Sequence, residues 1–571
     1  MIQPKYLNLT GLFADRVFRI PAYQRFYSWQ WKQRADLFGD INTLSMAPTD
    51  RHHFMATIVC FNTAQKASVG ATEYQVFEIV DGQQRITTLV LILRAVAKKL
   101  AAGRDKDDIE ELLVKRDGHL LLLQTNNANQ ALFNAYIRDG KCPTETEVKT
   151  QADRTLREGI DECEAFVEKW LSGGKGLLDL LRLVKNRLGF VVYDTEDRQA
   201  VYTVFEVLNS RGLEVDWLDK CKSVLMGRAF ETAKTEPARL AAIDELEKRW
   251  GNIYGRLACF SVPGHEVLRV TASIRCQSDA GKPLNAEVSL ASLKALCISP
   301  ATTQEVANWL YETTDALVVL EEQRHLGPVA DVLQARVLAV AIRLATQLVG
   351  KQKQICLDQW ERVTFRIYGL LRKDSRSKVG DYVRLARRIM RQEPGAKTYP
   401  EILKALILLG KDAPINKAVD EGLCAANCYE GYADECRYIL WRYEENLATQ
   451  AGADVNKECR EAIWNARTAA ETIEHIFPQT PAAGGPWTGK ITTGDVADHV
   501  HRIGNLVLLP KPLNSAAQRK GFAEKKTVYA KSEGLRMIGE VMKKTDWTQT
   551  EIETRETRIA DWAKKAWDDV K

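Results

Sequence analysis

Residues 77–93 read Phe-Glu-Ile-Val-Asp-Gly-Gln-Gln-Arg-Ile-Thr-Thr-Leu-Val-Leu-Ile-Leu, and the rest of the chain is organised around this stretch. The run that ends at Val80 is aromatic and β-branched, which is typical of a buried strand. Asp81-Gly82 ends that strand, because glycine reaches backbone angles that are closed to other residues. From Arg85 the apolar residues recur at helical spacing through Leu100. The stretch therefore predicts a strand, a tight polar turn and a helix.

The turn places an acid, two amides and an arginine at the start of the predicted helix. They are Asp81, Gly82, Gln83, Gln84 and Arg85. A helix N-terminus carries free backbone N–H groups and a partial positive charge, which suit an anionic ligand such as a phosphate. A plain strand–helix corner with a capping aspartate explains the same residues. The residues alone leave both interpretations open.

Two further segments carry unusual polar residues. Residues 20–29 read Ile-Pro-Ala-Tyr-Gln-Arg-Phe-Tyr-Ser-Trp, in which aromatic rings flank Gln24 and Arg25. Such a mixture can stack on a base and pair with a phosphate, although a half-buried surface strand has a similar composition. Residues 205–212 read Phe-Glu-Val-Leu-Asn-Ser-Arg-Gly, which is typical of a helix that ends at a glycine.

These three segments, in this order, resemble the signatures of the N-terminal domain of GmrSD-type restriction endonucleases. The family joins a ParB/sulfiredoxin-like nucleotide-hydrolysing domain to an HNH nuclease domain and acts on modified DNA. The resemblance implies a site for a nucleotide, ATP or GTP. The residues that it assigns to this site are Gln24, Arg25, Asp81, Gly82, Gln83, Gln84, Arg85, Asn209 and Arg211.

Composition bounds the chain without deciding its function. Its 571 residues suffice for two to four domains, and its apolar and charged fractions are those of a globular protein. The net charge of +5 permits nucleic acid as a partner but does not argue for it. Twelve cysteines without a regular spacing favour a reducing, cytoplasmic location. No apolar run approaches the ~20 residues that span a bilayer, so we expect no membrane partner.

The periodic pattern predicts an α+β fold that is mostly helical. Strands are expected at residues 53–61, where the chain should pair with the 77–80 strand, and at residues 188–193. Residues 105–190 read as helical with interruptions near residues 126–129 and 140–143, and residues 226–415 read as helical except for loops between residues 260 and 291. We expect three parts: an N-terminal ParB-like domain at residues 1–225, a helical middle at residues 226–415, and a nuclease domain at residues 416–571.

Residues 362–391 hold a cluster of positive charge that only Asp374 and Asp381 oppose. Several of the basic residues recur at helical spacing, so part of this charge should form one face of a helix. A basic helical face suits a phosphate backbone, although a solvated surface helix has the same pattern. The candidates for DNA contact are Arg372, Lys373, Arg376, Arg384, Arg387 and Arg388.

The C-terminal part carries a second group of motifs. Residues 472–479 read Thr-Ile-Glu-His-Ile-Phe-Pro-Gln, residues 499–509 read His-Val-His-Arg-Ile-Gly-Asn-Leu-Val-Leu-Leu, and Asn514 follows. Phosphodiester hydrolysis needs an activated water and a means of stabilising negative charge on the phosphate. A neutral imidazole can take the proton of that water near pH 7. An isolated histidine more often has a structural role than a catalytic one, so the case for catalysis rests on the motif as a whole.

This pattern resembles the HNH nuclease domain of the same family. The resemblance implies that His475 is the general base and that Asn505 orients the catalytic element. It places Asn514 near a single Mg²⁺ or other divalent ion, with Glu474 either as a ligand or as the partner of a lysine or arginine. His499 and His501 are substitute ligands, and His501 lies closer to the core motif. We expect no structural zinc, because paired Cys-x-x-Cys motifs are absent from the sequence.

Together these features predict a nucleotide-regulated, modification-dependent DNA endonuclease for defence against phage or foreign DNA. The expected partners are double-stranded DNA carrying a modification and a nucleotide that acts as regulator or substrate. Cutting both strands with one nuclease motif favours a homodimer. Two alternatives stay open: a nucleotide-gated nuclease without modification dependence, and a DNA-binding regulator whose nuclease motif is inactive.

Overall fold

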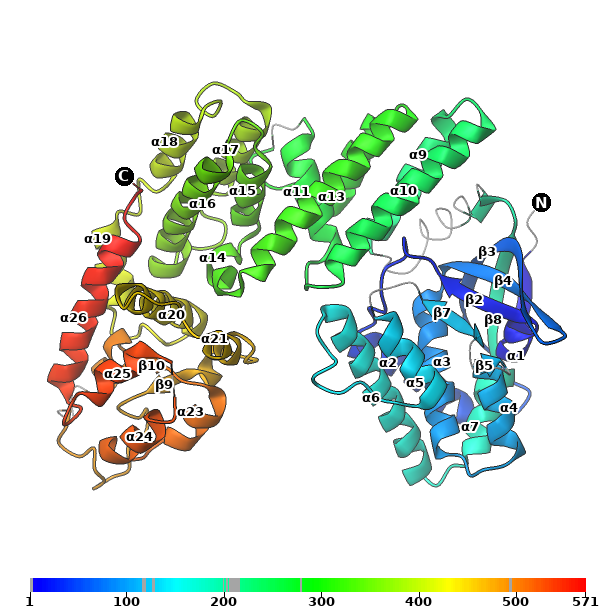
Figure 1. Cartoon of the computed structure of the whole chain (residues 1–571), viewed down its shortest axis with the longest axis horizontal. Helices are drawn as coiled ribbons and strands as arrows, with labels where there is room; N and C mark the ends of the chain where they lie inside the picture. The colour runs from blue at the N-terminus through cyan, green and yellow to red at the C-terminus, as the bar shows by residue number, and fades with distance from the viewer. Residues whose placement is uncertain are drawn as a thin grey trace. The chain divides into compact units, whose positions relative to one another are not determined.

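The computed structural model describes residues 4–115, 120–125, 129–198, 200–201, 204, 216–277, 280–491, 496–532 and 534–570. The chain forms two compact units (Figure 1). Unit 1 comprises residues 1–272 and 285–318, and unit 2 comprises residues 273–284 and 319–571. The division passes through α11 (Gly264–Arg275) and α13 (Pro300–Glu322). The predicted boundaries near residues 225 and 415 fall inside unit 1 and unit 2, and the threefold division stays a prediction.

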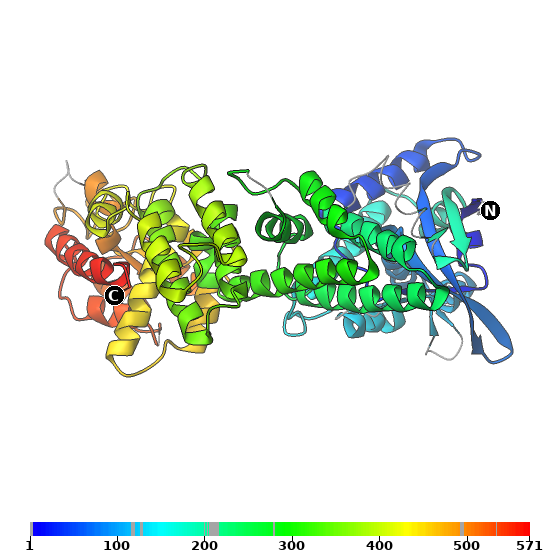
Figure 2. The same cartoon turned by 90° about the horizontal axis from the view of Figure 1, so that it is seen from above.

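Unit 1 is built on a mixed sheet whose described strands lie in the order β1-β8-β3-β4-β2-β7. The strand pairs β1–β8 and β3–β4 are antiparallel, whereas β8–β3, β4–β2 and β2–β7 are parallel. Figures 1 and 2 show the long β3–β4 hairpin protruding from this unit. The strands are β1 (Lys5–Asn8), β2 (Arg16–Ile20), β3 (His53–Val69), β4 (Thr72–Asp81), β7 (Leu123–Thr125) and β8 (Leu188–Thr195), with a separate β5 (Val114–Lys115) and β6 (Leu120–Leu121) pair.

Helices cover this sheet and extend beyond it. They are α1 (Leu9–Phe13), α2 (Trp31–Met46), α3 (Gln83–Lys99), α4 (Arg104–Leu113), α5 (Gln130–Asp139), α6 (Gln151–Ser172), α7 (Leu177–Asn186), α9 (Trp217–Thr232), α10 (Glu236–Leu257) and α12 (Ala286–Leu296). α3 is the core helix, and its residues from Ile86 to Ala97 are all buried. α3 packs against α4, α5, α6 and α7, which explains why its sequence is apolar on every side.

Unit 2 is almost entirely helical. Its first elements are η1 (Arg324–Leu326), α14 (Gly327–Ala330), α15 (Leu333–Leu344), α16 (Gly350–Thr364), η2 (Phe365–Leu370), α17 (Val379–Arg391), α18 (Tyr399–Leu409), α19 (Ile415–Ala418), η3 (Val419–Leu423), α20 (Ala433–Gln450), α21 (Lys457–Trp464) and η4 (Ala469–Glu471). Then come β9 (Ile473–His475), α22 (Val496–Val500), η6 (Ile503–Asn505), β10 (Leu506–Leu508), α23 (Lys511–Ala517), α24 (Phe522–Tyr529), α25 (Arg536–Met542) and α26 (Gln549–Ala566).

The last helix anchors the C-terminal end of unit 2. The ring of Trp567, directly after α26, lies 4.9 Å from that of Phe365 in η2. The Phe365 ring in turn lies 4.6 Å from Tyr438 of α20, so three distant segments share one aromatic cluster. α26 also packs on η6, next to the short antiparallel pair of β9 and β10.

The prediction of a mostly helical α+β chain is confirmed. The predicted pairing of the 53–61 and 77–80 strands is also confirmed, because β3 and β4 are antiparallel neighbours. The sequence predicts that the helical pattern of residues 105–190 is interrupted near residues 126–129 and 140–143. The structure adds β7, a three-residue strand beside β2 that the pattern did not predict. Among the described residues no single helix is both long and apolar enough to cross a membrane. The bent pair of residues 324–330 and 333–344 passes that test only when taken together.

Gly504 gives a direct test of the packing of α26. A Cβ atom at Gly504 would lie 2.1 Å from the carbonyl oxygen of Ile552 and 2.9 Å from the amide nitrogen of Glu556. Both are backbone atoms of α26, so a side chain at residue 504 has to displace that helix. We expect Gly504→Ala to lower the free energy of unfolding by about 1–3 kcal/mol, measured as a fall in the melting temperature of unit 2.

Gly539→Ala is the matched control. Gly539 lies within α25, and a Cβ atom there would meet no other atom within 4 Å. Alanine in an exposed helical position is favoured over glycine by about 0.5–1 kcal/mol, so this variant should melt at the same or a higher temperature. Equal melting temperatures for the two variants would contradict the proposed contact between Gly504 and α26.

Candidate functional site

The predicted polar turn in unit 1 joins β4 directly to α3. β4 ends at Asp81, Gly82 has φ of 91° and ψ of 0°, and α3 begins at Gln83. A Cβ atom at Gly82 would also come within 3.1 Å of Ile58, so both the left-handed backbone and the close approach to β3 require glycine. No side chain caps the first turn of α3. The N–H groups at this helix end therefore suit an anion.

The glutamines of this region are engaged with the backbone. Gln84 Oε1 accepts a hydrogen bond from the amide of Ser28 at 2.8 Å, and its Nε2 donates to Phe26 O at 3.1 Å. Gln83 Nε2 donates to Arg25 O at 3.3 Å. These bonds fasten residues 25–28 to the start of α3. The structure thus brings together two motifs that the sequence separates by more than fifty residues, and it uses the amides to do so.

Gln24 makes a similar link from the other side of the turn. Its Nε2 donates to Val80 O at 2.9 Å, just before Asp81. Its Oε1 accepts from Lys222 Nζ at 3.0 Å. Gln24 is itself buried, so it holds the end of β4 in place from within the core of the unit.

A buried charged network lies behind the turn. Arg25 Nε is 3.2 Å from Asp219 Oδ2, and Lys222 Nζ is 3.5 Å from Asp219 Oδ1. Tyr254 donates its hydroxyl to the same carboxylate at 2.5 Å. Burial acts to raise the pKa of Asp219, but Lys222 and Arg25 hold that pKa below its usual value. Sequence reasoning missed Asp219, Lys222 and Tyr254, and the acid–lysine spacing on α9 was the available signal.

Few groups of the turn are left to contact a ligand. Arg85 makes no hydrogen bond or ion pair with any described residue, and its guanidinium lies 5.9 Å from the centre of the Trp29 ring. Gln83 Oε1 is buried without a hydrogen-bond partner in the described part of the chain. Burial raises the pKa of Asp81, whose Oδ1 accepts from the amide of Gly82 at 2.8 Å. Asn209 and Arg211 lie outside the described residues.

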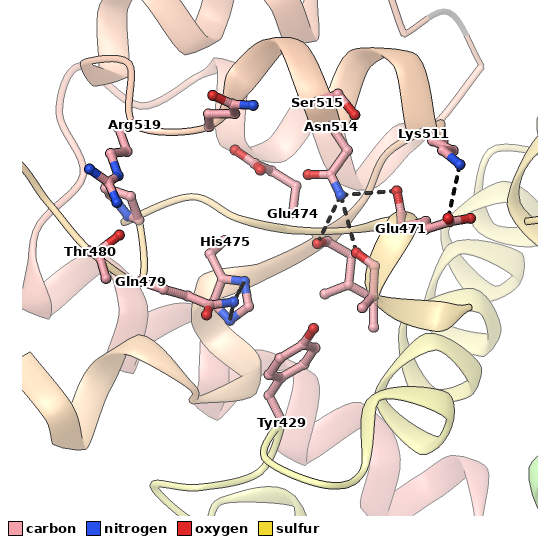
Figure 3. A pocket seen from close by; sticks show the side chains of 14 residues that line it. Tyr429, Glu471, Glu474, His475, Gln479, Thr480, Lys511, Asn514, Ser515 and Arg519 are labelled. Carbon is pink, nitrogen blue, oxygen red and sulfur yellow. Dashed lines mark hydrogen bonds and ion pairs between the residues drawn. The ribbon is translucent and has the colours of Figure 1, made fainter. Parts of the chain in front are cut away.

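The second candidate site is a pocket of about 510 Å³ in unit 2. β9 supplies its floor, α23 one wall, and the segment before α20 contributes Tyr429 (Figure 3). Its lining residues are Tyr429, Ala470, Glu471, Ile473, Glu474, His475, Pro478, Gln479, Thr480, Lys511, Asn514, Ser515, Gln518 and Arg519. The structure thus brings together three of the residues predicted for catalysis, Glu474, His475 and Asn514.

Asn505, the fourth predicted residue, lies beneath the pocket and not in its wall. Its side chain is fully buried. Its Oδ1 accepts from the amide of Phe477 at 2.8 Å and from Trp547 Nε1 at 3.1 Å. Its Nδ2 donates to Phe477 O and Val500 O, both at 2.9 Å. Asn505 therefore fixes the turn that follows His475.

His475 sits at the end of β9 and is only 6 % exposed. The ring of Tyr429 stands edge-on to it at 4.6 Å, and the ring of His501 stands edge-on at 5.4 Å. Gln479 Nε2 lies 3.1 Å from Nδ1 of the imidazole. Burial, with smaller contributions from His501 and Lys525, lowers the pKa of His475 to about 3. The imidazole is therefore neutral near pH 7 and able to accept a proton.

Glu474 points to the opposite side of β9 and pairs with a lysine, one of the two roles that the sequence left open. Its Oε1 accepts from Lys525 Nζ at 2.6 Å and from the Tyr529 hydroxyl at 3.0 Å. Lys525 also donates to His475 O at 2.7 Å and is completely buried. Burial raises the pKa of Glu474 and lowers that of Lys525, and each partner opposes the shift of the other. Lys525 thus holds both motif residues in place.

Asn514 presents an oxygen to the pocket. Its Nδ2 donates to the carbonyl oxygens of Ala470, Glu471 and Ile473 at 3.0–3.3 Å. These bonds fix the orientation of the amide, and Figure 3 shows its oxygen turned toward the side of Glu474. Nothing in the described part of the chain donates to that oxygen.

The oxygen atoms of Asn514 and Glu474 belong to the ligand class that Mg²⁺ prefers. Among the described residues no three histidine, cysteine, aspartate or glutamate side chains converge to hold a metal. Mg²⁺ needs only one or two protein oxygens, because waters and substrate phosphates complete its shell. Asn514 and the second carboxylate oxygen of Glu474 meet that requirement. His501 lies outside the pocket wall, where its Nε2 is 3.4 Å from Glu430 Oε1.

The six basic residues expected to meet DNA do not share one face. Arg387 is buried and donates to Ser273 O at 2.8 Å and Ala280 O at 2.6 Å. This corrects its assignment, because a guanidinium that caps backbone carbonyls within the core cannot reach a phosphate backbone. Arg388 donates to Pro394 O at 2.5 Å.

The other four basic residues lie nearer to solvent. Arg372 donates to Cys428 O at 3.0 Å and stacks on the ring of Tyr432 at 3.7 Å. Lys373, Arg376 and Arg384 are exposed, and Arg384 pairs with Asp381 at 2.7 Å. A DNA contact at these exposed positions stays a prediction.

Two family models match the chain. The model described as the GmrSD restriction endonuclease N-terminal domain matches residues 9–226, which include the turn at residues 81–85 and Lys222. The model described as the C-terminal domain of GmrSD restriction endonucleases matches residues 413–562, which include the whole pocket around His475. The comparison with curated proteins gives no match.

The pair of Glu474 and Lys525 leads to a stability prediction. Lys525→Met leaves the Glu474 carboxylate buried without its counter-charge, which should cost about 3–5 kcal/mol of the free energy of unfolding. The double variant Glu474→Gln with Lys525→Met removes that charge and should recover most of the loss. Thermal unfolding of the full chain, followed by tryptophan fluorescence, measures both.

The comparison isolates the buried charge, because His475 O loses its lysine donor in both variants. Equal melting temperatures for the single and double variants would contradict the prediction. They would mean that the bond from Lys525 to His475 O, and not the ion pair, carries the effect.

Proposed function

The chain belongs to the GmrSD-type type IV restriction endonucleases, and on this premise we propose that it cuts modified DNA with His475 as general base. Membership of the family makes it a defence DNA endonuclease whose partner is DNA. The modification dependence, the catalytic residues and the nucleotide are the proposal. Its substrate class is double-stranded foreign or phage DNA.

One observation carries the catalytic assignment. His475 lines an open pocket together with Asn514, and burial lowers the pKa of its imidazole so that the ring is neutral near pH 7. A neutral imidazole in such a position can accept the proton of an attacking water. The bond from Lys525 to His475 O and the bonds from Asn505 to Phe477 support the geometry, since both fix the backbone around the base.

We propose a divalent cation as the cofactor of this pocket. Asn514 and Glu474 would hold it, with Lys525 keeping its hold on the other oxygen of the carboxylate. When bound, such a cation, Mg²⁺ by its preference for oxygen ligands, supplies a Lewis acid that offsets charge on the phosphate and on the leaving oxygen. The residues of the chain orient the water and the phosphate and hold the proton at His475.

The turn at the start of α3 is proposed as the phosphate site of a nucleotide, ATP or GTP. The uncapped N–H groups of α3 and the guanidinium of Arg85 support this assignment. Gln24 and Gln84 take the supporting role of holding the turn. We propose that hydrolysis of the nucleotide regulates cutting, and that the network of Arg25, Asp219 and Lys222 connects the turn to α9.

Two features of DNA engagement complete the proposal. The exposed Lys373, Arg376 and Arg384 are proposed to contact the DNA backbone, because clustered cations suit phosphates. A second copy of the chain is proposed for double-strand cutting, since one nuclease motif cuts one strand at a time.

The substrate preference is tested by incubating the protein with matched DNAs and Mg²⁺, with and without ATP or GTP. The set contains unmodified, methylated, hydroxymethylated, glucosylated and phosphorothioate DNA. We expect cutting to be confined to a modified substrate. Equal cutting of every DNA would point to a nucleotide-gated nuclease, and nucleotide turnover without any cutting would point to a regulator.

The roles of the two sites are separated by a pair of variants. We expect His475→Ala to abolish cutting and to leave nucleotide turnover at the wild-type rate. Arg85→Ala should abolish turnover, because it removes the unpaired cation of the turn without breaking a hydrogen bond. Wild-type cutting by His475→Ala would show the catalytic assignment to be wrong. Gln84→Ala is the less informative variant, since it also releases residues 26–28.

A further inference from the structure

Arg519 is the unpaired cation of the pocket around His475. It follows α23 by two residues, lines the pocket and is exposed. Within the described part of the chain it makes no ion pair and its side chain makes no hydrogen bond. An arginine without a partner at the wall of a polar pocket has its full charge and all of its donors available to a ligand.

The other charged side chains of the pocket are already paired. Lys511 Nζ lies 2.9 Å from Glu471 Oε1. Glu474 is paired with Lys525 at 2.6 Å. Among the described residues that line the pocket, Arg519 is therefore the charged side chain that no opposite charge compensates. An uncompensated cation at the pocket wall suits an anionic ligand such as a phosphodiester.

The backbone sets the direction of this arginine. Gln518, the residue before it, has φ of 38° and ψ of −119°, a backbone conformation that is strained for a residue with a side chain. The strain turns the chain away from the axis of α23. The amide of Lys520 then donates to Ala517 O at 3.1 Å, and the Lys520 carbonyl accepts from Trp487 Nε1 at 3.0 Å. Arg519 is thus presented from a segment that is anchored after it.

Arg519 and Lys511 approach the pocket from different sides. In the view of Figure 3, Arg519 lies beside Thr480 on one side of His475 and Asn514, and Lys511 lies with Glu471 on the other. A phosphate that reaches the base from the side of Arg519 meets a free guanidinium. A phosphate on the side of Lys511 meets a cation whose charge Glu471 already offsets.

From this arrangement we infer that Arg519 binds a backbone phosphate of the DNA strand that is cut, next to His475. The inference rests on the proposed catalytic role of His475 and adds a substrate-binding residue to it. The planar guanidinium offers two parallel N–H donors to the phosphate oxygens, which a single ammonium cannot match. The strained backbone of Gln518 is then the conformation that directs the Arg519 side chain toward the pocket.

The test compares Arg519→Ala with Lys520→Ala. Lys520 is the adjacent exposed cation, but its side chain does not line the pocket and its carbonyl bond to Trp487 survives the change. Both variants lose one positive charge in the same segment. We expect Arg519→Ala to lower kcat/KM for DNA cutting roughly 10- to 100-fold, the range for a charged hydrogen bond, and Lys520→Ala to stay within about twofold of wild type.

Binding is measured separately in the His475→Ala protein, which keeps the DNA intact. The slope of log Kd against log salt concentration should be smaller by about one when Arg519→Ala is added, because one phosphate contact is lost. Arg519→Lys should restore that slope while recovering only part of the cutting rate, since lysine keeps the charge and loses the paired donors.

Three outcomes would overturn the inference: an equal loss in Arg519→Ala and Lys520→Ala, an unchanged salt slope in Arg519→Ala, or full recovery of cutting by Arg519→Lys. An equal loss in both variants would indicate a general effect of charge in this segment. An unchanged salt slope would indicate that Arg519 acts without contacting a phosphate. Full recovery by lysine would indicate that only a point charge is needed, without paired donors. The proposed function fails by a different result, namely cutting by His475→Ala. The binding measurement is independent of that result, so the two failures are distinguishable.

Discussion

The buried side chain of Asn505 holds together the segments that make the pocket of unit 2. One amide group satisfies the amide and carbonyl of Phe477, the carbonyl of Val500 and the indole of Trp547. A buried polar group that meets all of these partners is rigid, because every alternative leaves a hydrogen bond unmade. The position of His475, two residues before Phe477, follows from that rigidity. The residue before Asn505 must be glycine, because a side chain there would collide with the backbone of α26.

Unit 1 uses the same device at its polar turn. The side-chain amides of Gln24, Gln83 and Gln84 form hydrogen bonds with backbone atoms of the turn and of residues 25–28. These glutamines therefore mainly hold the backbone of the turn in place. They position the uncapped N-terminus of α3 and Arg85 beside it, and these two features make up the proposed phosphate site. The buried network around Asp219 extends this scaffold to α9.

Charge pairing decides which groups of the pocket are left for DNA. Lys525 compensates Glu474, and Glu471 compensates Lys511, so the pocket holds two neutral pairs and a neutral imidazole. Against that background Arg519 contributes a positive charge that no described residue offsets. Burial also separates the basic residues after α16, of which Lys373, Arg376 and Arg384 are exposed and Arg387 is not. Arg387 lies in the core and caps carbonyl oxygens.

The sequence by itself determined the strand, turn and helix around Asp81, the mostly helical α+β class, and the residues 474, 475 and 514 that share a pocket. The strand, turn, helix and fold class follow from local spacing, in which alternation and helical periodicity record burial directly. The three pocket residues follow from the resemblance of their segments to the family's nuclease motif. Only the tertiary structure decided that Lys525 pairs with Glu474, that Lys222 and Tyr254 stand behind the turn, and that Arg519 is free while Arg387 is buried. Hydrogen bonds and ion pairs between residues far apart in the chain leave no periodic trace. Whether a charge is exposed, paired or buried depends on which segments pack against it.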